Sequence, residues 1–178
     1  MPKKPRILLL DAVAVIGACE VGTWLRLVTE YEVLVSPIVM REAHFYDDPQ
    51  SGRRQPIDLA AMVQEGTIRE CEIALAETYA LLGRFDRTLS LHLGEAESLA
   101  YLVSVDDETD IQMITSDTAA LKAIGLLDLS HRSICLGDAL RAIGLNPRLE
   151  AQHETAHHKR YIGEGIQMRI QGRGLTRS

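Results

Sequence analysis

Short aliphatic runs alternate with stretches of helical spacing along most of this chain, and that alternation limits the fold more than any other feature. Residues 7–10 and 33–35 are continuous apolar runs, too short for helices and typical of buried strands. Apolar residues then recur at helical spacing through residues 13–30. A further helix is expected to begin at Pro37, with Ser36 as its cap. This order predicts an α/β fold in three layers, α/β/α, with a short, mostly parallel sheet flanked by helices.

The alternation continues to about residue 145. We expect further strands at 67–73, 111–115 and 133–135, and further helices at 57–64, 74–85, 95–105, 118–123 and 136–143. Residues 47–56 hold two Pro, a Gly and a Ser and are predicted to form a loop. The helix from Pro37 is expected to end by residues 47–49. From about residue 150 the pattern is lost, so an irregular segment, a lone helix or a partner-binding tail is expected there. We therefore divide the chain into an α/β domain of residues 1–149 and a basic C-terminal extension of residues 150–178.

The composition is that of one globular domain. Of the 178 residues, 46% are hydrophobic and 25% charged, which is enough for a core of aliphatic side chains. Aromatic residues make up 4%, which argues against base stacking as the main mode of nucleic-acid binding. The formal net charge is −6, but residues 151–178 carry five Lys and Arg against two Glu, so the remaining body is at −9. An acidic body favours cations and opposes phosphates, which the basic extension could offset.

Cysteine usage and hydropathy predict a cytoplasmic protein without membrane contact. Cys19, Cys71 and Cys135 are odd in number, and no two have the Cys-x-x-Cys spacing, so buried free thiols in a reducing compartment are expected. The basic start is followed by an apolar run that Asp11 interrupts, which makes the run too short for a signal peptide. Nowhere does the sequence contain 18 consecutive apolar residues.

Acidic residues stand at the ends of several predicted elements. Asp11 ends the run at 7–10, and Asp117 follows the run at 111–115. Because the carboxyl ends of parallel strands meet at one edge, both should point into the crevice where such sheets bind ligands. Helices that return from the sheet begin near the same edge, and these carry Glu42, Glu95 and Glu97. Capping and the helix dipole also favour acidic residues at helix starts. For each glutamate, a purely structural role is therefore as well supported as a role in the site.

Clustered carboxylates indicate a site for a hard divalent cation. Mg²⁺ and Mn²⁺ prefer carboxylate oxygen and water, and several close carboxylates need a cation or protons to offset their repulsion. Glu95 and Glu97 are two positions apart, so they face about 200° apart around a helix and only one can point inward. We favour Glu95 because it is nearer the start of the helix.

Four segments resemble, in order, the motifs of the PIN-domain family. They are Ile-Leu-Leu-Leu-Asp11, Val-Ser-Pro-Ile-Val-Met-Arg-Glu42, Leu-Gly-Glu95-Ala-Glu97 and Ile-Thr-Ser-Asp117. The resemblance covers about residues 6–145. It implies a PIN-like three-layer fold with a short parallel sheet. It also implies a nuclease that needs Mg²⁺ or Mn²⁺ and cuts RNA, often as the toxin of a toxin–antitoxin pair. The implied partners are thus RNA, an antitoxin protein and a second copy of the chain in a dimer.

The resemblance also assigns roles to individual residues. Asp11, Glu42 and Asp117 would be catalytic metal ligands, directly or through water, and the remaining family acid falls on Glu95 or Glu97. Hydroxyls for phosphate or for metal-bound water would come from Thr115 and Ser116, and a cation to offset developing charge from Lys122 or Arg41. The acidic body and the added length depart from the compact toxins and weaken the toxin role more than the fold.

Other functions fit parts of the sequence. A noncatalytic PIN-like module that binds a protein or nucleic acid is the main alternative, and a small-molecule-binding α/β domain is another. Residues 153–157 match the zinc-protease pattern His-Glu-x-x-His, in which two histidines on one helix bind zinc. We set this aside because the segment is polar and lies near the chain end, and no histidine follows His158 to serve as a distant third ligand.

Overall fold

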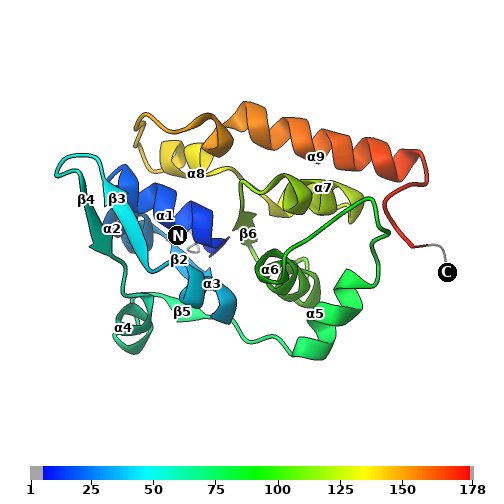
Figure 1. Cartoon of the computed structure of the whole chain (residues 1–178), viewed down its shortest axis with the longest axis horizontal. Coiled ribbons are helices and arrows are strands. Elements are labelled where there is room, and N and C mark those ends of the chain that lie inside the picture. The colour runs from blue at the N-terminus through cyan, green and yellow to red at the C-terminus, as the bar shows by residue number, and fades with distance from the viewer. Residues whose placement is uncertain (1–5, 177–178) are drawn as a thin grey trace.

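The computed structural model describes residues 6–176 and contains a four-stranded parallel sheet with strand order β5-β2-β1-β6. Its strands are β1 (Ile7–Leu10), β2 (Glu32–Val35), β5 (Arg69–Glu70) and β6 (Ile111–Ile114). In the inner strand β1, Leu10 is level with Val35 on one side and Ile114 on the other. Helices flank the sheet (Figure 1). The predicted three-layer α/β/α arrangement with a short parallel sheet is confirmed.

Alternate residues of β1 enter two separate hydrophobic cores. Leu8 and Leu10 face one core, Leu9 faces the other, and all three are fully buried. Burying a leucine side chain contributes about 2 kcal/mol, so both layers of helices help to hold this strand. The first core includes side chains of α1 (Ala12–Glu20), α2 (Trp24–Glu30), α3 (Pro37–Glu42), α4 (Leu59–Gln64) and α8 (Leu136–Ala142). The second includes those of α5 (Leu75–Leu82), α6 (Leu93–Ser104) and α7 (Thr118–Leu126).

The helix expected over residues 13–30 is broken in two. α1 ends at Glu20 and α2 begins at Trp24, with a bend of 117° between them. Gly22 lies in the break with a φ of +69°, a conformation that glycine adopts without steric cost. The Thr23 hydroxyl donates to the Ala18 carbonyl and closes the turn.

Among the described residues, no single helix has the length and apolar character needed to cross a membrane; α1 and α2 meet that test only as a bent pair.

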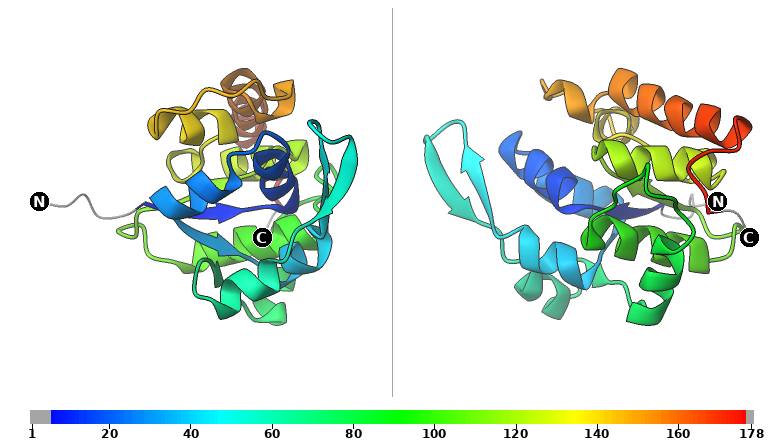
Figure 2. Two further views of the ribbon diagram at one scale, coloured as in Figure 1. Left: turned by 90° about the vertical axis from the view of Figure 1, so that its left-hand side faces the viewer. Right: turned by 45° about the vertical axis from the view of Figure 1, so that its right-hand side comes forward.

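The loop predicted at residues 47–56 is wrong in part, because most of it forms a β-hairpin. β3 (Phe45–Asp48) and β4 (Arg53–Pro56) pair in antiparallel fashion and project from the body (Figure 2). The Asp48 carboxylate accepts from the backbone and hydroxyl of Ser51, and Gly52 closes the turn with a φ of +64°. The turn-forming residues were identified correctly, but they belong to a two-stranded ribbon. The hairpin also explains why α3 ends at Glu42.

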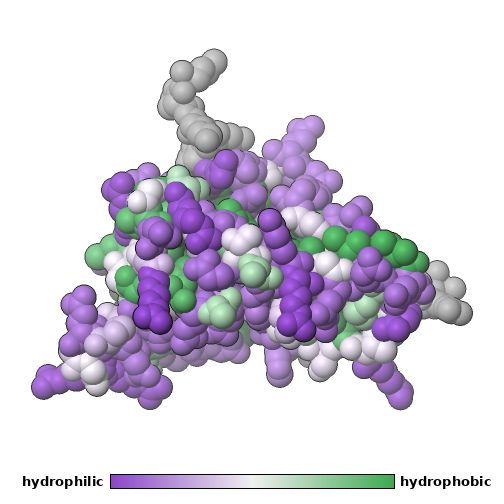
Figure 3. Space-filling model, turned by 90° about the horizontal axis from the view of Figure 1, so that it is seen from above, coloured by the Kyte–Doolittle hydropathy of each residue, from purple (hydrophilic) through white to green (hydrophobic). Residues whose placement is uncertain are grey.

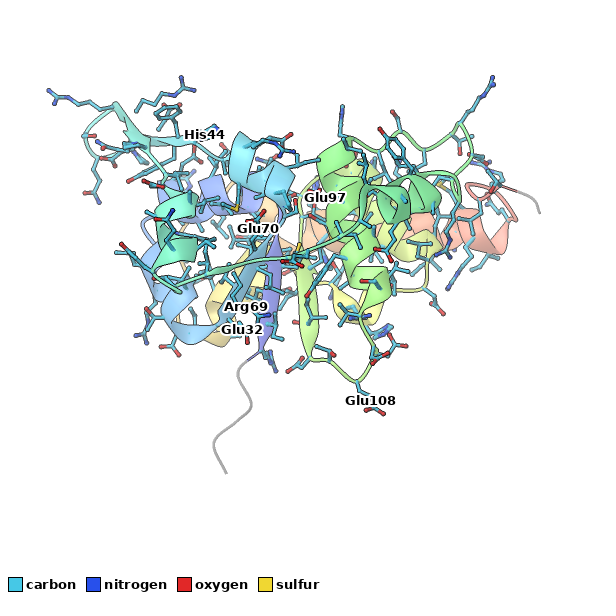
Figure 4. The ribbon with its side chains drawn as sticks, turned by 90° about the horizontal axis from the view of Figure 1, so that it is seen from below. Glu32, His44, Arg69, Glu70, Glu97 and Glu108 are labelled. Atoms are coloured by element: carbon cyan, nitrogen blue, oxygen red, sulfur yellow. The ribbon has the colours of Figure 1, made fainter. Side chains whose placement is uncertain are left out.

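The edge strand expected at residues 67–73 exists but is only two residues long. β5 pairs in parallel with the end of β2, and Arg69 forms an ion pair with Glu32 across the two strands (Figure 4). The weak strand expected at 133–135 is reduced to one parallel bridge between Met113 and Ser133.

The C-terminal extension is a helix that packs on the body. α9 (Thr155–Ile170) lies along α7 (Figure 1). The helices approach so closely that a Cβ atom added to Gly165 would lie 2.1 Å from the carbonyl oxygen of Lys122. His158 and Ile162 are buried in the contact, and the His158 ring bonds to the Ser133 hydroxyl at 2.8 Å. Of the possibilities left open for this segment, a helix is the one that forms.

Candidate carboxylate site

Asp11 is the most buried of the predicted site residues that carry a carboxylate. It follows β1 and caps α1, with Oδ1 accepting from the backbone N–H of Ala14 at 2.7 Å. Its Oδ2 accepts from the Thr115 hydroxyl at 2.6 Å, and the residue is only 5% exposed. Burial raises the pKa of this carboxyl to about 6, and the charge of Glu95 adds to the rise, although the hydrogen bonds from Thr115 and Ala14 oppose it. Asp11 is therefore an ionisable group held in a fixed orientation.

Asp117 lies beside Asp11 at the same edge of the sheet. It caps α7, and its Oδ1 accepts from the backbone N–H of Ala120 at 2.8 Å. The Thr115 hydroxyl, which donates to Asp11, accepts from the backbone N–H of Asp117 at 3.1 Å. The backbone N–H of Asp11 in turn donates to the carbonyl of Ile114 at 3.1 Å. The two aspartates are thus tied together by the ends of β1 and β6, as the strand order implies.

Glu95 extends this pair from the first turn of α6. Burial raises its pKa first, and the charges of Asp117 and Glu42 raise it further. Within residues 6–176, its Oε2 atom is buried and has no hydrogen-bond partner. A buried carboxylate oxygen without a partner is costly, so this atom is available to a cation or a proton.

Glu97 has a different environment. Its side chain lies between α6 and α3 (Figure 4), and Oε2 accepts from the backbone N–H of Ile38 at 3.1 Å. Ile38 is in the first turn of α3, whose N–H groups have no partner within the helix. Glu97 therefore accepts a hydrogen bond from a backbone N–H at the start of α3. Glu95, by contrast, belongs to the group with Asp11 and Asp117.

Glu42 reaches the group from the end of α3. Its carboxylate oxygens lie 3.5 and 3.8 Å from the position that a Cβ atom would take at Gly94. Gly94 is buried at the start of α6, one residue before Glu95. These are ordinary van der Waals distances, so the Glu42 carboxylate lies against the start of α6, beside Glu95.

The remaining predicted residues are divided between the site and α9. Thr115 is hydrogen-bonded to both aspartates. Ser116 is buried beside them, and its backbone carbonyl accepts from Nε2 of His157 at 2.9 Å. Lys122 points to α9, where its ammonium pairs with Glu164 at 3.0 Å. His157 was missed as a neighbour of the site because it lies 41 positions from Ser116 in the sequence.

The zinc-protease pattern at 153–157 does not form its expected geometry. His153 lies in the short 3-10 helix Ala151–His153 and packs on Gly17, whereas His157 is in α9. Glu154 pairs with Arg141 at 3.0 Å. The two histidines are therefore not on one helix face, as that chemistry requires.

The donor atoms of the carboxylate group fit a hard divalent cation. Within residues 6–176, no three acidic, histidine or cysteine side chains are already gathered at metal-binding spacing. Asp117 and Glu42, whose charges act on Glu95, nevertheless offer carboxylate oxygens, which suit Mg²⁺ or Mn²⁺. The Oε2 of Glu95 has no hydrogen-bond partner among the described residues, and neighbouring carboxylates add to the raised pKa values of Asp11 and Glu95, so these residues fit a divalent cation.

No protein-family model matches this chain, and no curated protein matches it either. Its function therefore has to be inferred from the chemistry of the site.

Proposed function

We propose that this protein is a PIN-like, metal-dependent endoribonuclease that hydrolyses RNA phosphodiester bonds with Mg²⁺ or Mn²⁺. The observation that carries the proposal is the unpaired, buried Oε2 of Glu95 beside the charges of Asp117 and Glu42, next to the buried Asp11. A divalent cation would offset the repulsion among these carboxylates and satisfy the free oxygen.

The four acids would hold the cation from three sides. Asp11 and Asp117 approach from the sheet edge, Glu95 from α6 and Glu42 from α3. A cation held by these residues would activate a water molecule for attack and offset negative charge on the phosphate.

The chain's own residues prepare this chemistry. Thr115 directs its proton to Oδ2 of Asp11, and the Ala14 N–H fixes Oδ1, so the carboxylate cannot rotate away. With a pKa of about 6, Asp11 is mostly ionised at neutral pH and able to bind a cation. Its burial excludes water from one side of the site.

The test is cleavage of a mixed RNA pool with Mn²⁺ by wild type and by Asp11→Asn. We expect the variant to lose at least about a hundredfold in rate, the order seen when a key electrostatic group is removed from an active site. Asparagine caps helices as well as aspartate does, so the fold should survive. Asp58→Asn is a matched control, because Asp58 caps α4 by the same bond, from the Ala61 N–H at 2.9 Å. Removal of metal with a chelator should abolish cleavage. Equal cleavage by wild type and Asp11→Asn would exclude the proposed catalytic role.

A second candidate is a noncatalytic PIN-like interaction module. It is favoured by one observation, that Asp11 and Asp117 both cap helices and Glu97 satisfies a third helix start. Such bonds give these acids a structural role without any cation. Absence of cleavage by both proteins in the same assay, with intact folding, would support this alternative.

The proposed protein partners come from the resemblance to PIN-domain toxins. An antitoxin protein would bind over the carboxylate site and inhibit it, and two copies of the chain would form the active dimer. Expression of wild type should arrest growth if the protein is such a toxin, and Asp11→Asn should relieve the arrest. Light scattering on the purified chain measures whether it dimerises.

A further inference from the structure

A strip of basic and polar side chains leads away from the carboxylate site along α9. It contains His157, Arg160 and Tyr161 of α9, Lys122 of α7 and Arg173 beyond the end of α9, and is called the basic strip below. Positions 157, 160, 161 and 164 recur at helical spacing on one face of α9, whereas the buried residues 158, 162 and 165 occupy another. The side of the molecule that α9 crosses is mainly hydrophilic (Figure 3).

The strip begins at the carboxylate site. The His157 ring bonds to the carbonyl of Ser116, the residue immediately before Asp117. Next along α9, the Tyr161 ring packs edge-on against His157 with ring centres 4.7 Å apart. The Nζ of Lys122 and the guanidinium carbon of Arg160 lie 5.5 and 5.2 Å from the centre of the Tyr161 ring. A chain of contacts therefore connects the site to the cations without a gap.

The far part of the strip is a groove. Lys122, Arg160, Gln167, Gln171 and Arg173 line an open concavity of about 580 Å³. Glu164 is the only acid among its lining residues and binds both Lys122 and Arg160, at 3.0 and 3.3 Å. Three cations thus face one carboxylate, although the chain as a whole carries −6. This local excess of positive charge suits a polyanion.

The two helices that form the groove pack closely against each other. Besides the close approach of Gly165 to Lys122, a Cβ atom at Gly125 would lie 2.3 Å from the carbonyl oxygen of Ile162, so backbone contacts backbone across the two helices. α9 extends about 20 Å from His157 to its end, from the rise of 1.5 Å per residue. A cationic platform of this length can follow several phosphates of a flexible strand.

We propose that the basic strip binds the phosphodiester backbone of single-stranded RNA and guides it to the carboxylate site. The inference rests on the proposed nuclease function, since it takes RNA as the substrate. Lys122, Arg160 and Arg173 contact phosphates, and Gln167 and Gln171 offer hydrogen bonds to bases or 2′-hydroxyl groups.

The experiment measures binding of a fluorescent 12-nucleotide RNA by anisotropy, in chelator, so that no cleavage occurs. The variant carries Lys122→Gln, Arg160→Gln and Arg173→Gln. A matched control carries Arg26→Gln, Arg53→Gln and Arg54→Gln, which removes the same charge from exposed positions on α2 and the hairpin. Thermal melts establish that both are folded. The strip variant should bind at least about tenfold more weakly, and its slope of log affinity against log salt should fall by about 2, as expected for three lost phosphate contacts. The control should stay within about twofold of wild type, because it loses net charge but no phosphate contact.

Two results would contradict the proposal that the basic strip binds RNA. One is an equal loss in both variants, which would mean that only net charge matters. The other is no measurable binding of the RNA by wild type at low salt. A metal-dependent hydrolysis assay on a small phosphodiester, run in parallel with Asp11→Asn, separates this failure from that of the nuclease. Hydrolysis that depends on Asp11, without RNA binding, would support the proposed nuclease activity and contradict RNA binding by the basic strip. Stronger binding of a duplex of the same sequence would replace the single-stranded substrate with a double-stranded one.

Discussion

At the scale of single residues, Asp11 combines two demands that oppose each other. It must cap α1, for which a charged oxygen is favourable, and it is buried, which disfavours the charge. The second effect is larger, and the pKa of the carboxyl rises from 3.8 to about 6. A buried carboxyl with a raised pKa, next to other acidic residues, is typical of a catalytic or ligand-binding site.

This shift predicts how stability depends on pH. Below about pH 3, Asp11 is protonated in both the folded and the unfolded state, so this group does not change the stability. Between about pH 4 and pH 6, the unfolded chain loses the proton while the folded protein keeps it. The folded state therefore loses up to about 3 kcal/mol from this group as the pH rises, at 1.36 kcal/mol per pKa unit.

Urea unfolding in chelator, at pH 4, 5, 6 and 7, measures this loss. Asp11→Asn has no proton to lose at this position, so relative to wild type it should gain about 2 kcal/mol in unfolding free energy from pH 4 to pH 7. A difference between the two proteins that does not change with pH would contradict the pKa assignment.

At the scale of elements, the contact of α7 with α9 depends on two glycines. Gly125 and Gly165 allow the backbones to approach more closely than any side chain permits. Neither glycine has a positive φ among the residues described, so steric room and not backbone conformation explains them. Since Asp117 is the N-cap of α7, this contact also supports the carboxylate site.

We predict that Gly165→Ala destabilises the protein by about 3 kcal/mol. The added methyl group would collide with the carbonyl of Lys122, and forcing a group into a tight contact typically costs 1–3 kcal/mol. Gly163→Ala in the same helix is the matched control. A Cβ atom there meets nothing within 4 Å, so the better helix propensity of alanine should stabilise by about 0.5–1 kcal/mol. Thermal melts of both variants provide the comparison, and equal melting temperatures would show that the helices can separate freely.

At the scale of the whole molecule, the C-terminal extension packs as part of the folded body. α9 covers α7, and beyond its end Leu175 forms a bridge with Phe85 near the end of α5. The Asp86 carboxylate accepts from the backbone N–H of Gly174 at 2.9 Å. The extension therefore contacts both ends of the second core.

Removing residues 147–178 should lower the melting temperature by about 10 °C or more. Deletion exposes the apolar face of α7 and removes the partner of Ser133, so several kcal/mol are lost, at roughly 2–4 °C for each kcal/mol in a chain of this size. A synthetic peptide of residues 147–178, added in excess, should restore part of the loss. An unchanged melting temperature after deletion would show that the extension is independent of the body.

The sequence by itself determined the layers, the parallel strands and the positions of Asp11 and Asp117. These follow from local patterns, because a short apolar run forms a buried strand and the ends of parallel strands meet at one edge. Even the cap of α3 at Ser36 could be predicted from adjacent residues.

Only the tertiary structure gave Glu95 and Glu97 different surroundings, and only it placed α9 beside Ser116. The choice between the glutamates depends on the rotation of α6, which is set by its packing and by the bond from Ile38, 59 positions away. The contact of His157 with Ser116 spans 41 positions. Such contacts arise from the summed burial of whole elements, and no local pattern in the sequence encodes them.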